Sequence, residues 1–474
     1  MKKTVNHSLL FARAYEQAEG GKIPRESRPV FHLTPLTGWM NDPNGFCYYH
    51  GQYHLFYQYN PYDTEWDAMH WGHAVSHDLL HWTYLPAALA PDAPYDSFGC
   101  FSGSAAELPD GRHLLMYTGV RQEGGDKSRE FQTQCIAVGD GTDYQKYEKN
   151  PVLDSNALPE GLSPYDFRDP KIWRTENGAY RCVVGARRED KRGVLLQYES
   201  RDGFEWRYIG VLAENDGRFG LMWECPDFFP LDGKHVLFVS PQDMLPEDFE
   251  YHNGNGTVCL TGRMDGDRFV EENNQAIDYG IDFYAPQTFT APDGRRILIG
   301  WMGIGDIPYS NPTTELGWQH CLTVPCEVTE GAGGKLLRNP VAELEKLVTR
   351  RTDLTGSGEQ VQLPFDLTAS AQSDSFELDI SNAVQMTFED GIFTLKFLDE
   401  KVGCGRDVRR VKLDSCDRLR VLADKTSLEI FLGGGENVLS TRFYPPTTAV
   451  TVTSRGLTCR AAELRAMEVD HLGK

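Results

Sequence analysis

A glycine turn recurs five times in the first three hundred residues and limits the possible fold more than any other feature. A polar residue precedes the glycine each time, in the pairs His50-Gly51, Asp110-Gly111, Asn177-Gly178, Asp232-Gly233 and Asp293-Gly294. Such pairs between strand-like runs favour tight hairpins. The glycines follow one another at intervals of 60, 67, 55 and 61 residues. A regular period is typical of repeated structural units, so the sequence predicts five β-blades.

One residue in a distinctive motif stands nine or ten positions before each turn. Equivalent positions in radially arranged blades converge on one axis. These residues are Asp42 in WMNDPNG, Phe101 in FSGS, Asp169 in FRDP, Glu224 in WECPD and Tyr284 in DFYAPQ. Three of the five are carboxylates, so the repeat and the chemistry predict the same central pocket.

The sequence divides into four parts. Residues 1–28 are expected to form a helical extension in which Ser8 caps a short helix, and residues 29–329 alternate strand-like runs with turns. Residues 330–351 contain glycines and a short helical stretch, which predicts a linker, and the alternation in 352–474 predicts an antiparallel sandwich. The predicted fold class is all-β, a five-bladed β-propeller followed by a β-sandwich.

Charge and cysteine content exclude several classes of partner. The chain has 47 basic and 69 acidic residues, a formal charge of -22, which disfavours nucleic acid and anionic membranes as partners. Its eleven cysteines are scattered and form no C-x-x-C pair, which favours free thiols in a reducing compartment. No apolar run has the length of a signal peptide or a membrane span. We therefore expect a cytoplasmic protein, and its oligomeric state is left open.

Asp42, Asp169 and Glu224 are the candidates for catalysis. Hydrolysis of a glycosidic bond needs one carboxylate that attacks or supports water and one protonated carboxyl that releases the leaving oxygen. Taken singly, an aspartate beside a proline is a common turn residue or a partner in a surface ion pair. The shared position of all three acids in the repeat favours chemistry over these alternatives.

The neighbours of the three acids predict different charge states. The apolar neighbours in WECPD should hinder ionisation of Glu224, so that it holds a proton near neutral pH. The hydrogen-bonding neighbours in WMNDPNG should favour the ionised form of Asp42. Arg168 precedes Asp169 directly and should keep that carboxylate charged.

Six motifs in one order, WMNDPNG, QYNP, FSGS, FRDP, WECPD and DFYAPQ, resemble the signature set of glycoside hydrolase family 32, the β-fructosidases. The resemblance extends from about His32 to Trp301. The segment from Leu428 to Pro445 resembles, more weakly, the C-terminal sandwich of that family. The resemblance implies a propeller plus sandwich, hydrolysis with retention of configuration, and no cofactor.

The resemblance also implies the role of each site residue. Asp42 would be the nucleophile, Glu224 the acid/base and Asp169 the transition-state stabiliser. The residues that would line the fructosyl pocket are Asn41, Gln58, Trp66, Phe101, Ser102, Arg168, Tyr284 and Trp301. The expected substrate is a small fructoside, sucrose or sucrose 6-phosphate. The alternatives are a short-fructan hydrolase, a fructosyltransferase and, from another class, a non-catalytic sugar-binding propeller, which the acid trio disfavours.

A series of histidines offers a competing interpretation. His70, His73, His77 and His81 are spaced three, four and four residues apart, which on a helix would form one metal-binding face. The segment contains a glycine, lies between hairpins and carries the pattern S-x-D-x-x-x-W, which recurs from Ser200 to Trp206. We therefore predict a strand and a turn, and no metal site.

A phosphorylated substrate would need a local cationic patch, because the net charge repels a dianion at long range. The candidates lie in two loops and are Arg121, Lys127, Arg129, Arg187, Arg188, Lys191 and Arg192. No motif fixes any of them, and solvated surface positions are the alternative for each.

Overall fold

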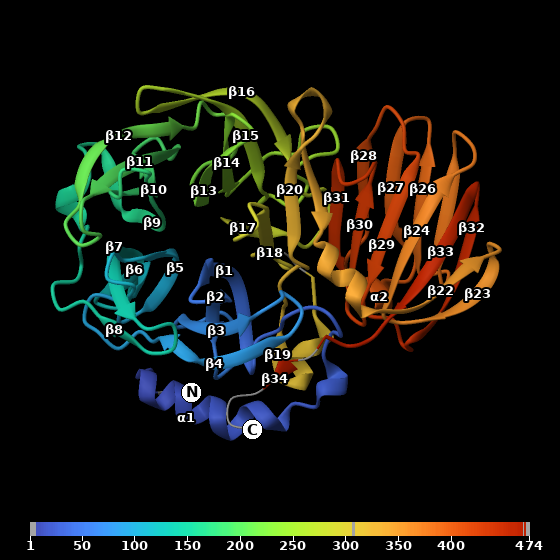
Figure 1. Ribbon diagram of the computed structural model, residues 1–474, viewed down its shortest axis with the longest axis horizontal. Helices are drawn as coiled ribbons and strands as arrows, with labels where there is room; N and C mark the ends of the chain where they lie inside the picture. Colours follow the sequence, from blue (N-terminus) through green and yellow to red (C-terminus); the bar gives the residue numbers. More distant parts are fainter. Residues whose placement is uncertain (1–5, 306–308, 468, 471–474) are drawn as a thin grey trace.

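The computed structural model describes residues 6–305, 309–467 and 469–470, and within them the strands form seven sheets. Five sheets surround a common centre and two face each other in the C-terminal part of the chain (Figure 1). The chain end returns to the first sheet, because β34 pairs in parallel with β4.

The five sheets of the ring follow the chain in order. The first contains β1 (Gly38–Tyr49), β2 (Gln52–Asn60), β3 (His70–Ser76) and β4 (Trp82–Leu89), with β19 (Trp318–Gln319) and β34 (Val469–Asp470) at its edges. The second contains β5 (Gly99–Glu107), β6 (His113–Glu123), β7 (Asp126–Gly139) and β8 (Tyr144–Lys146). The third contains β9 (Leu162–Arg174), β10 (Tyr180–Arg188), β11 (Gly193–Ser200) and β12 (Arg207–Glu214). The fourth contains β13 (Trp223–Leu231), β14 (Lys234–Pro241), β15 (Val258–Asp265) and β16 (Arg268–Ala276), and the fifth β17 (Tyr284–Thr290), β18 (Arg296–Trp301), β20 (Cys326–Glu330) and β21 (Leu336–Pro340).

Two six-stranded sheets form the C-terminal sandwich. One has the order β22 (Val348–Leu354), β33 (Leu457–Leu464), β24 (Phe365–Ala371), β29 (Arg418–Ala423), β30 (Ser427–Leu432) and β31 (Asn437–Arg442). The other has the order β23 (Ser357–Gln362), β32 (Ala449–Arg455), β25 (Phe376–Ile380), β26 (Val384–Glu389), β27 (Ile392–Phe397) and β28 (Val408–Lys412), with the short helix α2 (Glu400–Gly403) after β27. Alternate apolar residues of both sheets meet in one core, which includes Phe365, Leu378 and Ile430.

The five repeated glycines lie at the corner between the first and second strands of the five ring sheets. Their φ angles are 85°, 84°, 83°, 84° and 90°, which a residue without a Cβ adopts at little cost. His50 and Asp232 also have positive φ, 46° and 48°, so these two turns have the left-handed pair typical of a two-residue hairpin. The hairpin predicted at each glycine is confirmed.

Neighbouring sheets of the ring share apolar cores. Leu114 and Met116 of the second sheet pack with Phe167 and Tyr198 of the third. Phe229 and Phe238 of the fourth sheet lie in a core with Leu298 of the fifth. Burial on both faces explains why the central strands are nearly continuous apolar runs.

The N-terminal helix α1 spans Leu9–Glu19 and begins after Ser8, as predicted. The Ser8 hydroxyl accepts a hydrogen bond from the Phe11 amide at 3.4 Å, and Gly20 follows the last helical residue. Glu16 is buried on the face of the helix that contacts β4, where it accepts a hydrogen bond from the Ala87 amide at 2.9 Å. The helix thus covers the outer edge of the first sheet (Figure 1).

The segment 330–351, expected to be a linker, is more ordered than that. Leu336–Pro340 forms β21, which pairs with β20 and completes the fifth ring sheet. A 3-10 turn at Ala342–Leu347 follows, and β22 of the sandwich begins at Val348. The ring therefore continues past residue 329, because β20 finds its outer partner only in this segment.

The two S-x-D-x-x-x-W segments are outer turns held by the aspartate, as predicted. Asp78 accepts hydrogen bonds from the Leu80 and His81 amides at 3.0 and 2.8 Å. Asp202 accepts from the two amides at the equivalent positions, at 2.8 and 3.0 Å. Each tryptophan donates its indole N–H to the carbonyl three residues before it.

Within the described residues, the structure contains no helix long and apolar enough to cross a membrane.

Candidate active site

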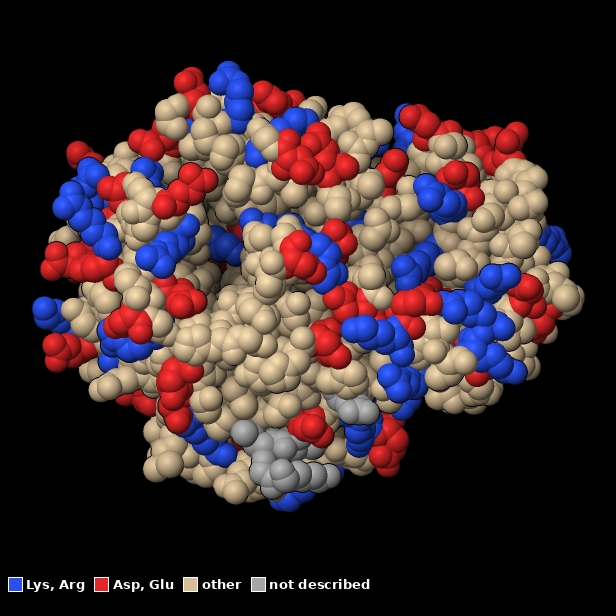
Figure 2. All heavy atoms as spheres, in the orientation of Figure 1, with Lys and Arg blue, Asp and Glu red and all other residues tan. Residues whose placement is uncertain are grey.

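A pocket of about 740 Å³ lies at the centre of the ring, and Figure 2 shows the surface hollowed there. All three candidate acids, Asp42, Asp169 and Glu224, line it. So do the eight predicted substrate-binding residues, Asn41, Gln58, Trp66, Phe101, Ser102, Arg168, Tyr284 and Trp301. The motifs that are far apart in the sequence thus meet in one cavity.

The first strand of each ring sheet brings one motif to the pocket. Asp42 lies on β1, Ser102 on β5, Asp169 on β9, Glu224 on β13 and Tyr284 on β17. In all five strands the pairing with the second strand shifts register at the site residue. Such bulges bend a strand and re-aim its side chains, which accounts for five side chains that face one axis.

Two site residues on these bulges have left-handed backbone. The φ angle is 65° at Asp169 and 46° at Cys225, in a region that costs a non-glycine residue about 1 kcal/mol or more. Hydrogen bonds hold both: the Asp169 amide donates to Thr118 Oγ1 at 2.9 Å, and the Cys225 amide donates to Asp169 Oδ2 at 2.9 Å. These two hydrogen bonds hold the strained residues in place and join the second, third and fourth ring sheets at the floor of the pocket.

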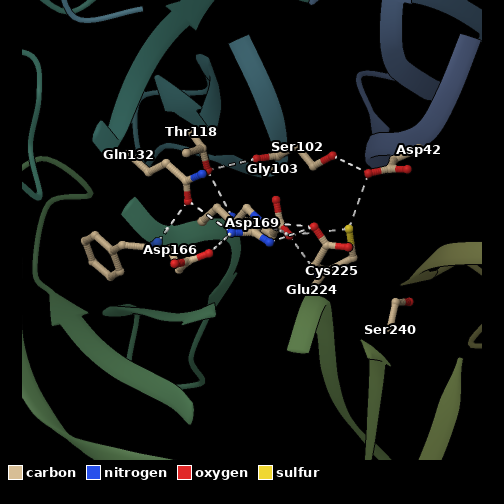
Figure 3. Close-up of polar contacts among 12 residues, drawn as sticks. Asp42, Ser102, Gly103, Thr118, Gln132, Asp166, Asp169, Glu224, Cys225 and Ser240 are labelled. Atoms are coloured by element: carbon tan, nitrogen blue, oxygen red, sulfur yellow. Dashed lines mark hydrogen bonds and ion pairs between the residues drawn. The ribbon is translucent and has the colours of Figure 1, made fainter. Parts of the chain in front are cut away.

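Hydrogen-bond donors contact both oxygens of Asp42, and Figure 3 shows the contacts with Ser102 and Cys225. Ser102 Oγ donates to Oδ2 at 2.7 Å, and the Asn41 amide donates to Oδ1 at 3.2 Å. The Cys225 thiol lies 3.4 Å from Oδ2. Burial raises the pKa of Asp42 and the nearby Glu224 raises it further, while these hydrogen bonds oppose the shift. The predicted hydrogen-bonding setting is confirmed, but burial outweighs it.

Glu224 is held at both carboxylate oxygens. Arg168 donates to Oε1 from Nε at 3.0 Å and from Nη2 at 2.9 Å, and the Tyr284 hydroxyl donates to Oε2 at 2.7 Å. Two fixed donors restrict the rotation of the carboxyl group, which orients it in the cavity.

The partnership predicted between Arg168 and Asp169 is the weaker one. Arg168 Nε lies 4.0 Å from Asp169 Oδ2, whereas the same guanidinium makes two short hydrogen bonds to Glu224. Burial raises the pKa of Asp169, and the attraction of Arg168 opposes that shift without reversing it. The expectation that Arg168 fixes the charge of Asp169 is therefore wrong, because the packing of β9 against β13 brings the guanidinium to Glu224.

Aromatic side chains form one wall of the cavity. Phe101 contacts Trp66 edge to face with ring centres 5.5 Å apart, and Trp66 is 41% exposed at the mouth. Trp301 lies near Tyr284 and Trp39. Gln58 is fully enclosed and donates to the Cys100 carbonyl at 3.0 Å. The aromatic faces on this wall share the pocket with the converging polar and charged groups, an arrangement found in small-molecule pockets.

Several residues of the pocket were not predicted. They are Trp39, Glu130, Gln132, Tyr165, Asp166, Gln242, Asn255 and Gly305. Trp39 and Asp166 stand three residues before Asp42 and Asp169, so their place in the motif strands was a usable signal. Glu130, Gln242 and Asn255 lie outside every motif, and only the packing of the sheets brings them to the cavity.

The structure separates the seven candidates for a phosphate site. Arg187 lines the pocket. Arg188 and Arg192 pair with Glu214 and Asp190 on the surface, Arg129 pairs with Glu123, Arg121 stacks on Phe131, and Lys191 is exposed. The Lys127 side chain lies outside the described part of the structure.

The histidine series does not form a helical face. His70 and His73 lie in β3, where they are buried, and His77 and His81 belong to the following turn. The predicted strand and turn are confirmed. Among the described residues, no group of three or more histidine, cysteine, aspartate or glutamate side chains is arranged to hold a metal ion.

Buried carboxylates and aromatic side chains converge in the pocket at the centre of the ring. This arrangement indicates a class of protein, the hydrolases of glycosidic bonds. The family model for the N-terminal domain of glycosyl hydrolases family 32 matches residues 32–340, and the C-terminal model of the same family matches residues 335–468. The chain therefore belongs to glycoside hydrolase family 32. It is a hydrolase that acts on fructosides.

Characterised relatives cover most of the chain. It is 40% identical over 447 residues to the sucrose-6-phosphate hydrolase of Klebsiella pneumoniae, covering 91% of this chain and 92% of that protein. It is 38% identical to the raffinose invertase of Escherichia coli, covering 88% and 89%. The β-fructofuranosidase structure from Bombyx mori superimposes with a TM-score of 0.86 at 34% identity, covering 96% and 97%. The fold is the propeller and sandwich of this family, and a cytoplasmic location stays a prediction.

Proposed function

We propose that the protein is a retaining β-fructofuranosidase that hydrolyses sucrose 6-phosphate, sucrose or both by double displacement. The convergence of Asp42, Asp169 and Glu224 in one pocket carries this proposal. The names of the relatives from Klebsiella pneumoniae and Escherichia coli, a sucrose-6-phosphate hydrolase and a raffinose invertase, support a sucrose-type fructoside, and a variant of the Bombyx mori enzyme was solved in complex with sucrose.

In the first step, Asp42 attacks the anomeric carbon of the fructosyl unit and forms a covalent ester. Glu224 gives its proton to the glycosidic oxygen, so that the glucosyl half leaves as an alcohol. In the second step, the Glu224 carboxylate removes a proton from water, and the water oxygen displaces Asp42. Asp169 holds fructosyl hydroxyls and stabilises the positive charge that develops on the sugar.

The neighbours of the acid/base fit a residue that must change its charge during turnover. Arg168 donates two hydrogen bonds to Oε1 of the Glu224 carboxyl group and so holds it in place before and after the leaving group has been protonated. Tyr284 keeps the second oxygen in place, with its hydroxyl also 2.8 Å from the Ser240 carbonyl. Both residues therefore act as positioning residues for Glu224.

We also infer that each of the five ring sheets is one blade of the propeller. The five first strands that supply the pocket and the five glycine corners support this count. Raffinose is a second candidate substrate because of the likeness to the Escherichia coli raffinose invertase.

Sugar release from sucrose, sucrose 6-phosphate and raffinose by the purified protein tests the activity. Proton NMR of the first-formed fructose anomer tests retention. Release of the β-anomer is expected, and release of the α-anomer would require an inverting mechanism. A protein that binds these sugars without cleaving them would be a sugar-binding propeller.

A further inference from the structure

The acid-rich character of the pocket poses a problem for a phosphorylated substrate. The charged residues that line it are five carboxylates, Asp42, Glu130, Asp166, Asp169 and Glu224, and two guanidiniums, Arg168 and Arg187. A phosphate dianion is repelled by such a set unless a cation contacts it directly. Among the described residues that line the pocket, these two arginines are the cations that could contact the phosphate.

Arg168 is not available for this role. Its guanidinium donates twice to Glu224 and once to Asp166, at 3.2 Å, and its side chain is only 9% exposed. A phosphate on Arg168 would have to displace the acid/base from its donor. Arg168 is thus committed to the reacting groups at the floor of the cavity.

Arg187 lies at the mouth, on the same wall. The exposed fraction of the side chains rises from 6% at Asp169 through 13% at Asp166 to 32% at Arg187. Asp166 joins the two arginines, since its Oδ1 pairs with Arg168 and its Oδ2 accepts from Arg187 Nε at 2.8 Å. Arg187 is therefore linked through Asp166 to the arginine that holds Glu224, and its side chain is the most exposed of this series.

The Arg187 guanidinium has N–H donors that remain free although Asp166 binds its Nε and Nη2. A guanidinium has five N–H donors, and Asp166 takes those of Nε and Nη2 on a single oxygen. Within the described residues, Arg187 has no other hydrogen-bond partner. The remaining N–H groups form a fixed fork of the kind that binds phosphate oxygens.

We propose that Arg187 binds the phosphate of a phosphorylated leaving group and that Asp166 positions it, which makes Arg187 the residue that selects sucrose 6-phosphate over sucrose. This inference rests on the proposed β-fructofuranosidase activity. The phosphate of sucrose 6-phosphate is on the glucosyl half, the part that points to the mouth when the fructosyl unit occupies the floor. Glu130 also lines the pocket and opposes the phosphate, so its charge should limit the preference.

The main experiment compares kcat/KM for sucrose 6-phosphate and sucrose in the unmodified enzyme and in R187Q, R187K and R188Q. R187Q should reduce kcat/KM for sucrose 6-phosphate roughly 10- to 100-fold more than kcat/KM for sucrose, as expected for the loss of a charge-assisted hydrogen bond. R187K should retain part of the preference because it keeps the charge. R188Q is the matched control: Arg188 is the next residue on β10 but pairs with Glu214 outside the pocket, so both substrates should be cleaved as before.

Three further readouts isolate the phosphate contact. Glucose 6-phosphate should inhibit sucrose cleavage more strongly than glucose does, and R187Q should abolish that difference. The difference in KM for sucrose 6-phosphate between the unmodified enzyme and R187Q should shrink at high ionic strength, because salt weakens the attraction between Arg187 and the phosphate, while KM for sucrose should not change. E130Q should shift the preference several-fold toward sucrose 6-phosphate, opposite to R187Q. Thermal unfolding of each variant verifies that it is folded.

The outcomes separate this inference from the proposed function. If the enzyme cleaves both sugars and R187Q lowers both rate constants equally, Arg187 is not a phosphate ligand and the β-fructofuranosidase activity stands. The same holds if the unmodified enzyme shows no preference and no inhibition by glucose 6-phosphate. If neither sugar is cleaved, the proposed function fails, and calorimetric titration with glucose 6-phosphate against R187Q still decides whether Arg187 binds phosphate.

Discussion

At the residue scale, the pKa values of the site acids depend on burial and on contacts with residues of neighbouring sheets. Burial raises the pKa of both Asp42 and Asp169, with Ser102 and Arg168 respectively opposing the shift. Negative charge is therefore costly at the floor of the pocket, and a sugar whose ring becomes positively charged in the transition state relieves that cost.

Replacing Asp42, the proposed nucleophile, should abolish turnover and leave the fold intact. D42N keeps the shape of Asp42 and the hydrogen bond from Ser102, but it cannot form the covalent ester. We expect kcat for sucrose to fall by roughly 10⁴-fold or more, with an unchanged circular dichroism spectrum. Residual activity within tenfold of the unmodified enzyme would exclude Asp42 as the nucleophile.

The proposed acid/base role of Glu224 predicts a loss of activity that depends on the leaving group of the substrate. In E224Q the side-chain oxygen can still accept the hydrogen bond from Arg168, but the side chain has no acidic proton to give to the glycosidic oxygen. We expect a loss of roughly 10²- to 10⁴-fold on sucrose and a much smaller loss on an aryl fructoside, whose leaving group needs no proton. Equal losses on the two substrates would remove Glu224 from the acid role. R188Q is the control, because Arg188 pairs with Glu214 outside the pocket and its loss should not distinguish these leaving groups.

At the scale of single elements, the N-terminal helix α1 attaches to the ring through a buried acid. Burial raises the pKa of Glu16 to about 7, against the opposing hydrogen bond from the Ala87 amide. The folded protein therefore binds a proton at Glu16 that the unfolded chain, with an ordinary pKa near 4.5, releases. Between these two pH values the stability contributed by this contact falls as the pH rises.

E16Q should remove that pH dependence. The glutamine side chain can still accept from Ala87, but it carries no charge to desolvate. We expect E16Q to be more stable than the unmodified protein by up to about 3 kcal/mol at pH 8, and equally stable near pH 4.5. Urea unfolding at both pH values measures the difference.

Glu19 provides the matched control for this experiment. It lies on the same helix but pairs with Lys22 at the surface. E19Q should change stability by less than about 0.5 kcal/mol at either pH. A variant E16Q that is less stable at pH 8 would show that Glu16 contributes through a charge-dependent contact instead.

At the scale of the whole molecule, a buried charge cluster joins the ring to the sandwich. His32, which precedes β1, contacts Asp424 through Nδ1 and Glu429 through Nε2, both at 2.9 Å. Burial lowers the pKa of His32, but the two carboxylates outweigh it and raise the pKa to about 9. The ring and the sandwich are therefore joined by an ionic contact. It lies inside an apolar core that both share and that includes Leu33 and Leu422.

Breaking this contact should destabilise the protein strongly. H32Q removes the cation that contacts both Asp424 and Glu429, and among the described residues only Glu429 keeps a second cation, Arg338, at 3.7 Å. Removing one partner of a buried ion pair typically costs about 3–5 kcal/mol. The folded pKa lies above the ordinary value of 6.5, so the stabilisation is complete below pH 6.5 and is lost as the pH rises through 9. The stability difference between H32Q and the unmodified protein should therefore shrink over this interval.

Urea unfolding at pH 6 and pH 9.5 measures this difference. H77Q is the control, because His77 is exposed in a turn of the first sheet and should alter stability little at either pH. A difference that is the same at both pH values would mean that His32 acts through packing rather than through charge.

The repeat, the hairpin corners and the pocket-lining motifs could be predicted from sequence because their signals are local. A glycine at a positive φ, a capping serine before α1 and an acid nine residues before a turn depend on few neighbours in the chain. The relation of Arg168 to Glu224 could not be predicted in this way, since the two are 56 residues apart and meet through the packing of β9 against β13.

The sequence by itself thus determined the class of fold, the order of the hairpins and the identity of the eleven predicted pocket residues. Only the tertiary structure decided that β21 completes the fifth sheet, that Arg187 stands at the mouth, and that His32 joins ring and sandwich. The physical reason is the same in each case. Turn chemistry and periodicity act over a few residues, whereas hydrogen-bond partners and buried charges depend on which distant strands pack together and how deeply they are buried.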